Sequence, residues 1–108
     1  MKFIIEVPFK ENIYNLMRKA GYHFFEKDEK TLEYNFVRPV GSNTYPRFHI
    51  FLTIKDKDLI FDLHLDQKKP IYKGVTAHSG EYEGEIVEKE AERIKEILSS
   101  PPSLSLGN

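Results

Sequence analysis

Histidine and aspartate recur on two neighbouring segments in the middle of the chain, within RFHIFLTIKDKDLIFDLHLD at positions 47–66. Imidazole and carboxylate groups commonly serve acid–base catalysis, metal binding and phosphate recognition. His49 lies on the first segment, and His64 lies on the second between Asp62 and Asp66. Whether these groups can act together depends on how the two segments are positioned relative to each other.

The two segments have the alternating pattern of a β-hairpin. Apolar residues occupy every second position, which predicts two strands with one apolar face and one mainly polar face. The charged stretch 55–58 forms the turn, and both a two-residue and a four-residue turn set His49 opposite His64. A slip of one residue would bury Asp62 and is disfavoured, whereas a slip of two residues leaves the histidines as diagonal neighbours on the same face.

Several kinds of chemistry are open to this pair of imidazoles. Directly opposed residues on one sheet face have Cβ atoms about 4.5–5.5 Å apart, so His49 and His64 could share a metal ion, a phosphate group or a proton. As a catalytic pair they would act as acid and base on a phosphodiester. The ligand-binding residues predicted around them are Arg47, Asp62, Asp66, Lys69 and His78, and Glu33 or Asn35 could join from a neighbouring strand.

A metal site would need a third ligand, which His78 could supply. This residue lies in the stretch 67–84, where no periodicity is visible and Pro and Gly recur, so we expect a long loop there. If the loop folds over the polar face, His49, His64 and His78 form a three-histidine set for a divalent transition metal with an open coordination position. The alternative is an ordinary solvent-facing sheet, in which Arg47 and Asp66 form only a cross-strand ion pair.

The remaining elements predict the fold class. We expect strands at 2–7, 22–26 and 32–37, a short helix within 11–21 that ends at Gly21, and a helix at 85–98. The second helix has an apolar stripe, and its charged residues, Arg93 among them, are assigned to a solvated side. The order β-α-β-β-β-β-α predicts an α+β two-layer sandwich, with a mainly antiparallel sheet of four to five strands and both helices on one face.

Composition narrows the functional classes. The 108 residues predict one domain at 1–98 followed by a disordered tail at 99–108. The absence of cysteine favours a cytoplasmic protein without disulfides or thiolate metal sites. No apolar run is long enough for a membrane span. The formal charge of −1 argues against non-specific nucleic-acid binding.

Two resemblances add to these observations. The segments YPRFHIFL, LIFDLHLDQKKP and AHSGEYEGEIVEKEAERIK resemble a family of small hypothetical proteins from uncultivated bacteria and archaea, and this resemblance implies no activity. The segment LMRKAGYHFFEK and the order helix, antiparallel strands, helix are similar to HicA-type toxins, which have a fold like that of double-stranded-RNA-binding domains. The Gly-Ser-His signature of those toxins is missing here, since Asn43 follows Gly41 and Ser42.

The sequence therefore leads to one main hypothesis and two alternatives. The main hypothesis is a small domain that binds a small ligand, a metal or a phosphate-containing group at the His/Asp-lined sheet face under the 67–84 loop; whether it is also an enzyme is left open. The first alternative is a protein–protein interaction module that uses this face, where Phe51 and Ile60 supply an apolar anchor, or an edge strand. The second is RNA binding or a ribonuclease activity like that of the HicA-type toxins.

Overall fold

The computed structural model describes residues 1–7, 11–67 and 80–99, without the side chains of 80–83. Lys69, His78 and most of the predicted 67–84 loop lie outside the described residues, as does the predicted tail after Ser99. The elements, in chain order, are β1 (Lys2–Glu6), α1 (Ile13–Lys19), β2 (His23–Lys27), β3 (Tyr34–Pro39), β4 (Arg47–Lys55), β5 (Asp58–Asp66) and α2 (Gly80–Ser99).

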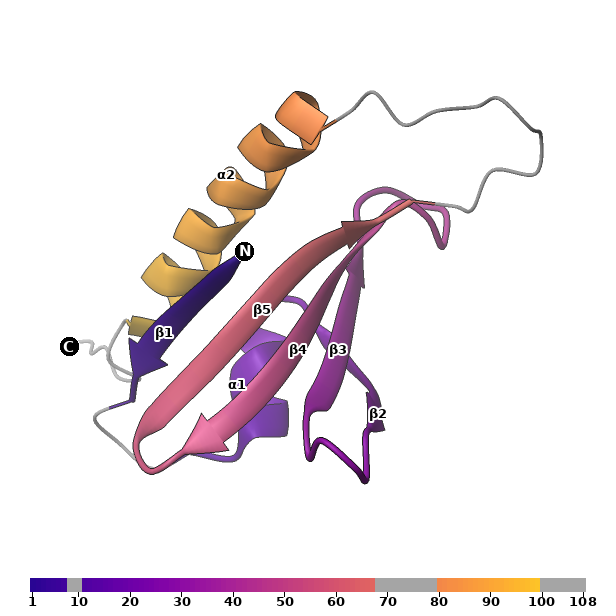
Figure 1. Ribbon diagram of the computed structural model, residues 1–108. Coiled ribbons are helices and arrows are strands. Elements are labelled where there is room, and N and C mark those ends of the chain that lie inside the picture. Colours follow the sequence, from indigo (N-terminus) through magenta and orange to yellow (C-terminus); the bar gives the residue numbers. More distant parts are fainter. Residues whose placement is uncertain (8–10, 68–79, 100–108) are drawn as a thin grey trace, which may run out of the picture.

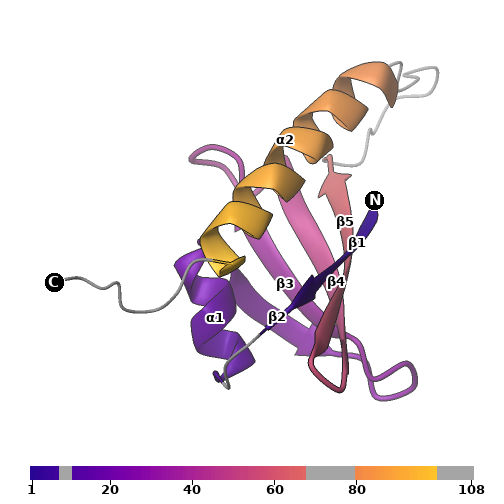
Figure 2. The same ribbon diagram turned by 90° about the vertical axis from the view of Figure 1, so that its left-hand side faces the viewer.

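The five strands form one sheet in the order β1-β5-β4-β3-β2, and every neighbouring pair is antiparallel. Both helices lie against the same face of this sheet (Figures 1 and 2). The other face carries no helix, and we call it the open face. The predicted α+β two-layer sandwich is thereby confirmed.

The β4–β5 hairpin has the register that the alternation predicts. Lys55 pairs with Asp58 across a two-residue turn, and His49 pairs with His64. Asp56, the first turn residue, has φ = 58°, a conformation that Asp tolerates better than most residues. The central strand pair thus presents its two histidines on the same side of the sheet.

The core lies between the helices and the apolar faces of the strands. It contains side chains from every strand except the edge strand β2, and Phe36, Ile50, Leu52 and Phe61 are fully buried. Burying one such side chain stabilises the fold by about 1.5–3 kcal/mol. The helices contribute the following buried residues to the core: Leu16, Met17, Val87, Ala91, Ile94 and Leu98.

Capping residues define both ends of α1, which packs against β2 and β3. The side chain of Asn12 caps its N-terminus by accepting hydrogen bonds from the backbone N–H groups of Tyr14 and Asn15, at 2.8 and 3.3 Å. Gly21 follows the helix with φ = 89°, in the conformation expected at the C-terminal end. This turn leads the chain directly into β2.

Helix α2 is longer than the sequence pattern indicates. It begins at Gly80, whereas the predicted helix begins at Glu85 and the predicted loop extends to Gly84. Glycine is a poor helix former, by about 1 kcal/mol relative to Ala, but adding a turn to an existing helix is much easier than starting one. Among the described residues, no helix combines the length and the apolar character that crossing a membrane requires.

Strand β2 contains an irregularity that affects both faces of the sheet. Phe24 pairs with Phe36 while Glu26 pairs with the next residue, Asn35, so Phe25 is an extra residue in a β-bulge. Phe24 packs against α1, where its ring lies 5.2 Å from that of Tyr14. Phe25 points to the open face instead.

Gly21 gives a direct test of this chain path. A Cβ atom at this residue would lie 3.0 Å from Cδ of Arg38 and would sit on a backbone with positive φ. We expect Gly21→Ala to lower the free energy of unfolding by about 1–2 kcal/mol, measured by urea denaturation. Gly41→Ala is the matched control, since nothing lies within 4 Å of its added methyl group; equal effects would contradict this account.

Candidate functional site on the open sheet face

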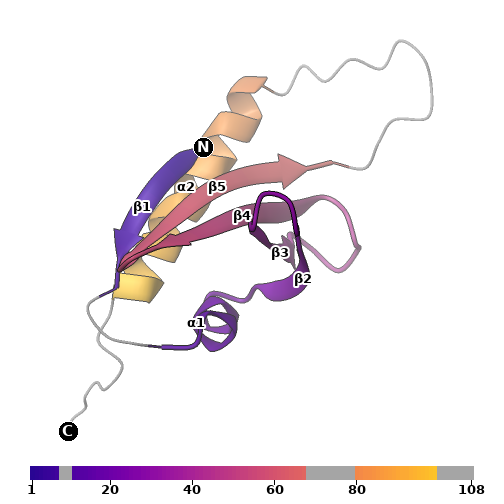
Figure 3. The same cartoon turned by 60° about the horizontal axis from the view of Figure 1, so that its bottom comes forward.

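The open face brings together residues from three adjacent strands. Asn35 lies on β3, Arg47 and His49 on β4, and His64 on β5. The cross-strand pairs Arg47–Asp66, His49–His64 and Phe51–Asp62 form successive rows along the hairpin. Figure 3 shows how β5, β4 and β3 follow one another across the sheet.

His49 is held firmly in place. Its Nδ1 atom donates a hydrogen bond to Asp66 Oδ2 at 2.9 Å, and its Nε2 atom forms a hydrogen bond of 2.8 Å with Asn35 Oδ1. Its ring stacks on Phe51 with centroids 4.3 Å apart, and only 12% of the side chain is exposed. Because both ring nitrogens are engaged, His49 organises the face and is poorly placed to meet a ligand itself.

His64 is the accessible imidazole of the pair. Its side chain is 47% exposed, and Nε2 lies 3.1 Å from Asp62 Oδ1. The Asp62 carboxylate also lies 3.6 Å from the α-amino group of Met1. The carboxylate therefore orients the His64 ring while part of its own charge is balanced by the amine.

Arg47 completes the arrangement next to the two histidines. Its guanidinium carbon lies 5.2 Å from the ring centroid of Phe25 and 4.7 Å from that of Tyr45. Nε is buried and forms no hydrogen bond within the described residues; its nearest acidic partner is Asp66 Oδ2, at 3.6 Å. Two aromatic rings therefore fix a cation whose hydrogen-bonding capacity is not fully used.

The structure thus brings five of the predicted site residues onto one face: Arg47, His49, Asp62, His64 and Asp66. Asn35 joins them from β3, while Lys69 and His78 lie outside the described residues. Within residues 1–7, 11–67 and 80–99, no three metal-ligating side chains come together in a way that could hold an ion. The three-histidine metal site stays a prediction, because its third member is among the residues not described.

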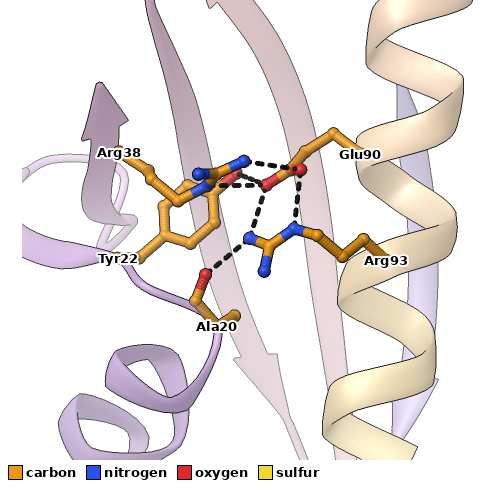
Figure 4. A network of polar contacts seen from close by, with 5 residues as sticks. All are labelled: Ala20, Tyr22, Arg38, Glu90 and Arg93. Carbon is orange, nitrogen blue, oxygen red and sulfur yellow. Dashed lines mark hydrogen bonds and ion pairs between the residues drawn. The ribbon is translucent and has the colours of Figure 1, made fainter. Parts of the chain in front are cut away.

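A second polar cluster lies on the helix-covered face, and the sequence analysis missed it. Glu90 of α2 is 4% exposed and accepts hydrogen bonds from three side chains (Figure 4). Tyr22 donates at 2.7 Å, Arg38 at 3.0 and 3.2 Å, and Arg93 at 2.9 Å to each carboxylate oxygen. Arg93 also donates to the carbonyl oxygen of Ala20 at the end of α1.

This cluster joins α2 to β3 and to the α1–β2 connection. Burial raises the pKa of Tyr22, and the Glu90 carboxylate raises it further. For Glu90, burial acts to raise the pKa, but the hydrogen bonds from Arg93, Arg38 and Tyr22 outweigh it and the net shift is downward. The assignment of Arg93 to a solvated side was therefore incomplete, since its guanidinium reaches back to Glu90. A signal was present: Glu90 lies within the apolar stripe, between Val87 and Ile94.

Comparisons with protein-family models, with curated proteins and with solved structures find no match to this chain. The resemblance to small hypothetical proteins and the likeness to HicA-type toxins therefore stay expectations. The function has to be argued from the side chains of the open face.

The two histidines should respond differently to truncation. His49→Ala removes two hydrogen bonds and leaves the buried amide of Asn35 without its partner, so we expect a loss of about 1–3 kcal/mol in unfolding free energy. His64→Ala, at an exposed site, should stay within about 0.5 kcal/mol of the parent. Urea denaturation of both variants tests this; losses of equal size would show that His49 is not the organising residue.

The pH dependence of stability should report the Glu90 cluster. Because the pKa of Glu90 is lowered on folding, its stabilising effect is fully present above the unfolded Glu pKa of about 4.3 and is lost as the pH falls through the folded value. We expect Glu90→Gln to be less stable than the parent by about 2–3 kcal/mol at pH 7, and this difference to shrink in acid.

Urea denaturation from pH 7 down to about 3 measures both quantities. Glu92→Gln is the matched control, because the Glu92 side chain is 76% exposed and its ion pair with Lys95 spans 3.7 Å. A gap between parent and Glu90→Gln that stays constant across this pH range would contradict the assignment.

Proposed function

We propose that this protein is a binding domain for a phosphate-bearing small ligand, and that the open face around His64 and Arg47 is its binding site. The observation that supports this most directly is the Arg47 guanidinium. It lies against two aromatic rings and has a buried Nε without a hydrogen-bond partner among the described residues. An oxyanion is the ligand best matched to an arginine in this state, because the guanidinium binds phosphate through two parallel hydrogen bonds.

The spacing of Arg47 and His64 fits one ligand group. Arg47 and His64 are diagonal neighbours, since Arg47 pairs with Asp66 and His64 with His49. Diagonal positions on an antiparallel pair lie about 7–8 Å apart, so long side chains can converge on a single phosphate between them. His49 and Phe51 lie next to these two residues on the same face, and their stacked rings support the binding site.

The charges of the site are consistent with an anionic ligand. Asp66 is paired with His49 and Arg47, and Asp62 is paired with His64 and lies near the α-amine of Met1. Each carboxylate is therefore occupied by a cationic or hydrogen-bonding partner. Lys2, which pairs with Asp62 across β1 and β5, adds a further positive charge to this part of the sheet.

A pocket at the edge of the sheet gives a small ligand additional room near His64. It has a volume of about 380 Å³ and is lined by Met1, Leu63, His64, Leu65, Gly84, Val87 and Glu88. Concave sites with a few polar groups on an apolar lining are typical of small-molecule binding. His64 thus stands where the open face meets a hollow between β5 and α2.

Binding is better supported than catalysis. A catalytic pair needs both imidazoles within reach of the reacting atoms, whereas His49 is 12% exposed and engaged at both nitrogens. We therefore assign His64 and Arg47 to ligand contact and His49 to positioning. The role of the two histidines as acid and base stays a prediction of the sequence.

Titration with inorganic phosphate, followed by NMR of histidine and arginine side-chain signals, tests the proposal. We expect saturable shifts at His64 and Arg47. His64→Ala and Arg47→Lys should each weaken binding about tenfold, equivalent to about 1.4 kcal/mol, because the lysine keeps the charge but not the paired hydrogen bonds.

Arg18→Lys is the matched control, since Arg18 lies on α1, away from the open face, and its guanidinium donates a hydrogen bond to Asn15. Absence of saturation, or affinity that neither site variant changes, would refute the proposed site. A parallel titration with chloride at equal ionic strength separates specific binding from general screening.

A further inference from the structure

The outer edge of β2 is the most exposed part of the sheet. β2 is the last strand in the order, and all five of its residues, His23–Lys27, are exposed. Phe24 is 45% exposed and Phe25 is 52% exposed, which is unusual for two adjacent phenylalanines. An edge strand with unpaired backbone groups and exposed apolar side chains readily pairs with another strand.

The bulge in β2 gives this edge an unusual pattern of faces. Phe24 and Lys27 point to the helix-covered face, where Phe24 contacts Tyr14 and Lys27 lies 5.0 Å from the Tyr34 ring. His23, Phe25 and Glu26 point to the open face, as their contacts or strand partners show. Two consecutive residues, Phe25 and Glu26, therefore share one face, and the normal alternation is broken between them.

We propose that β2 pairs antiparallel with β2 of a second copy of this chain, about a two-fold axis that passes between Phe25 and Glu26. Directly opposed residues must lie on the same face of a sheet. With the axis at the bulge, Phe25 lies opposite Glu26 of the second copy and Phe24 lies opposite its Lys27. Each opposed pair along the strand then has both side chains on the same face of the sheet. Shifting the register by one residue in either direction sets Phe24 or Lys27 against a residue of the opposite face. The bulge thus selects one register.

The backbone supports the same pairing. Asp28 donates its N–H to the Glu33 carbonyl oxygen at 2.9 Å, so its backbone groups are directed toward β3. Because these groups alternate along a strand, the N–H and C=O of Lys27 are directed to the free edge. In the proposed register the N–H and C=O of Lys27 lie opposite the backbone of Phe24 in the second copy and can form hydrogen bonds with it. The two-fold symmetry repeats this contact on the other side of the axis.

The charges of the edge are also complementary in this register. His23 would lie opposite Asp28 of the second copy, and the Lys27 ammonium would lie beside the Phe24 ring. Within the described part of the chain, neither His23 nor Glu26 forms an ion pair. The resulting dimer has one continuous sheet and sets Phe25, which contacts Arg47, against the second copy. A second copy therefore fits this edge better than an unrelated peptide, since its own residues supply the matching charges and faces.

Sedimentation equilibrium between about 10 μM and 1 mM, the range of weak association, tests the proposal. The parent should be in monomer–dimer equilibrium. Lys27→Glu should raise the dissociation constant at least about tenfold, since it replaces the cation beside the Phe24 ring of the second copy with an anion, twice per dimer. Lys30→Glu is the matched control, because it makes the same charge change outside β2.

Amide hydrogen exchange on the parent protein gives a second measurement that does not depend on a variant. Exchange at Lys27 should slow as the protein concentration rises, because its N–H becomes hydrogen-bonded in the dimer. A monomer at all concentrations, unchanged exchange at Lys27, or equal dissociation constants for Lys27→Glu and Lys30→Glu would each overturn the proposal.

Discussion

The antiparallel pairing of β4 and β5 is the constraint on which the rest of the structure depends. These are the two longest strands, and they lie at the centre of the sheet, so their register decides which side chains meet the helices. In that register Phe48, Ile50, Leu52, Leu59, Phe61 and Leu63 all reach the core. The same register necessarily places His49, His64 and their carboxylates together on the other side. The candidate site is thus a consequence of the strand register that buries the apolar residues in the core.

The two faces of the sheet carry polar clusters with different physical roles. On the helix-covered face, the Glu90 carboxylate holds two guanidinium groups and a tyrosine hydroxyl, and its burial is tolerated because every part of its charge is hydrogen-bonded. This cluster joins distant segments of the chain. On the open face, the chain of contacts from Arg47 through Asp66 and His49 to Asn35 is only partly buried. It leaves Arg47 incompletely satisfied and His64 exposed, which is why we assign binding to that face.

The edges of the sheet show how local irregularity can create specificity. A bulge usually makes an exposed edge strand less able to pair with another strand, because it interrupts the regular pattern of backbone hydrogen bonds. In β2 it also sets Phe25 and Glu26 on one face, so only a strand with the same irregularity matches both faces. A feature that discourages non-specific pairing thereby favours one particular partner.

Hydrophobic alternation, turn chemistry and helix signals in the sequence determined the fold class, the strand order along the chain and the hairpin register. These features depend on residues that are close in sequence, and among such residues the period-two pattern of strands and the 3.6-residue pattern of helices can be seen. The extent of α2 was not determined this way, because glycine propensity at Gly80 and Gly84 is outweighed by the rest of the helix. Only the tertiary structure decided that Glu90 meets Tyr22 and Arg38, that Asn35 holds His49, and that Phe25 reaches Arg47. Each of these contacts joins separate elements, and one-dimensional periodicity gives a residue's face but not its partner.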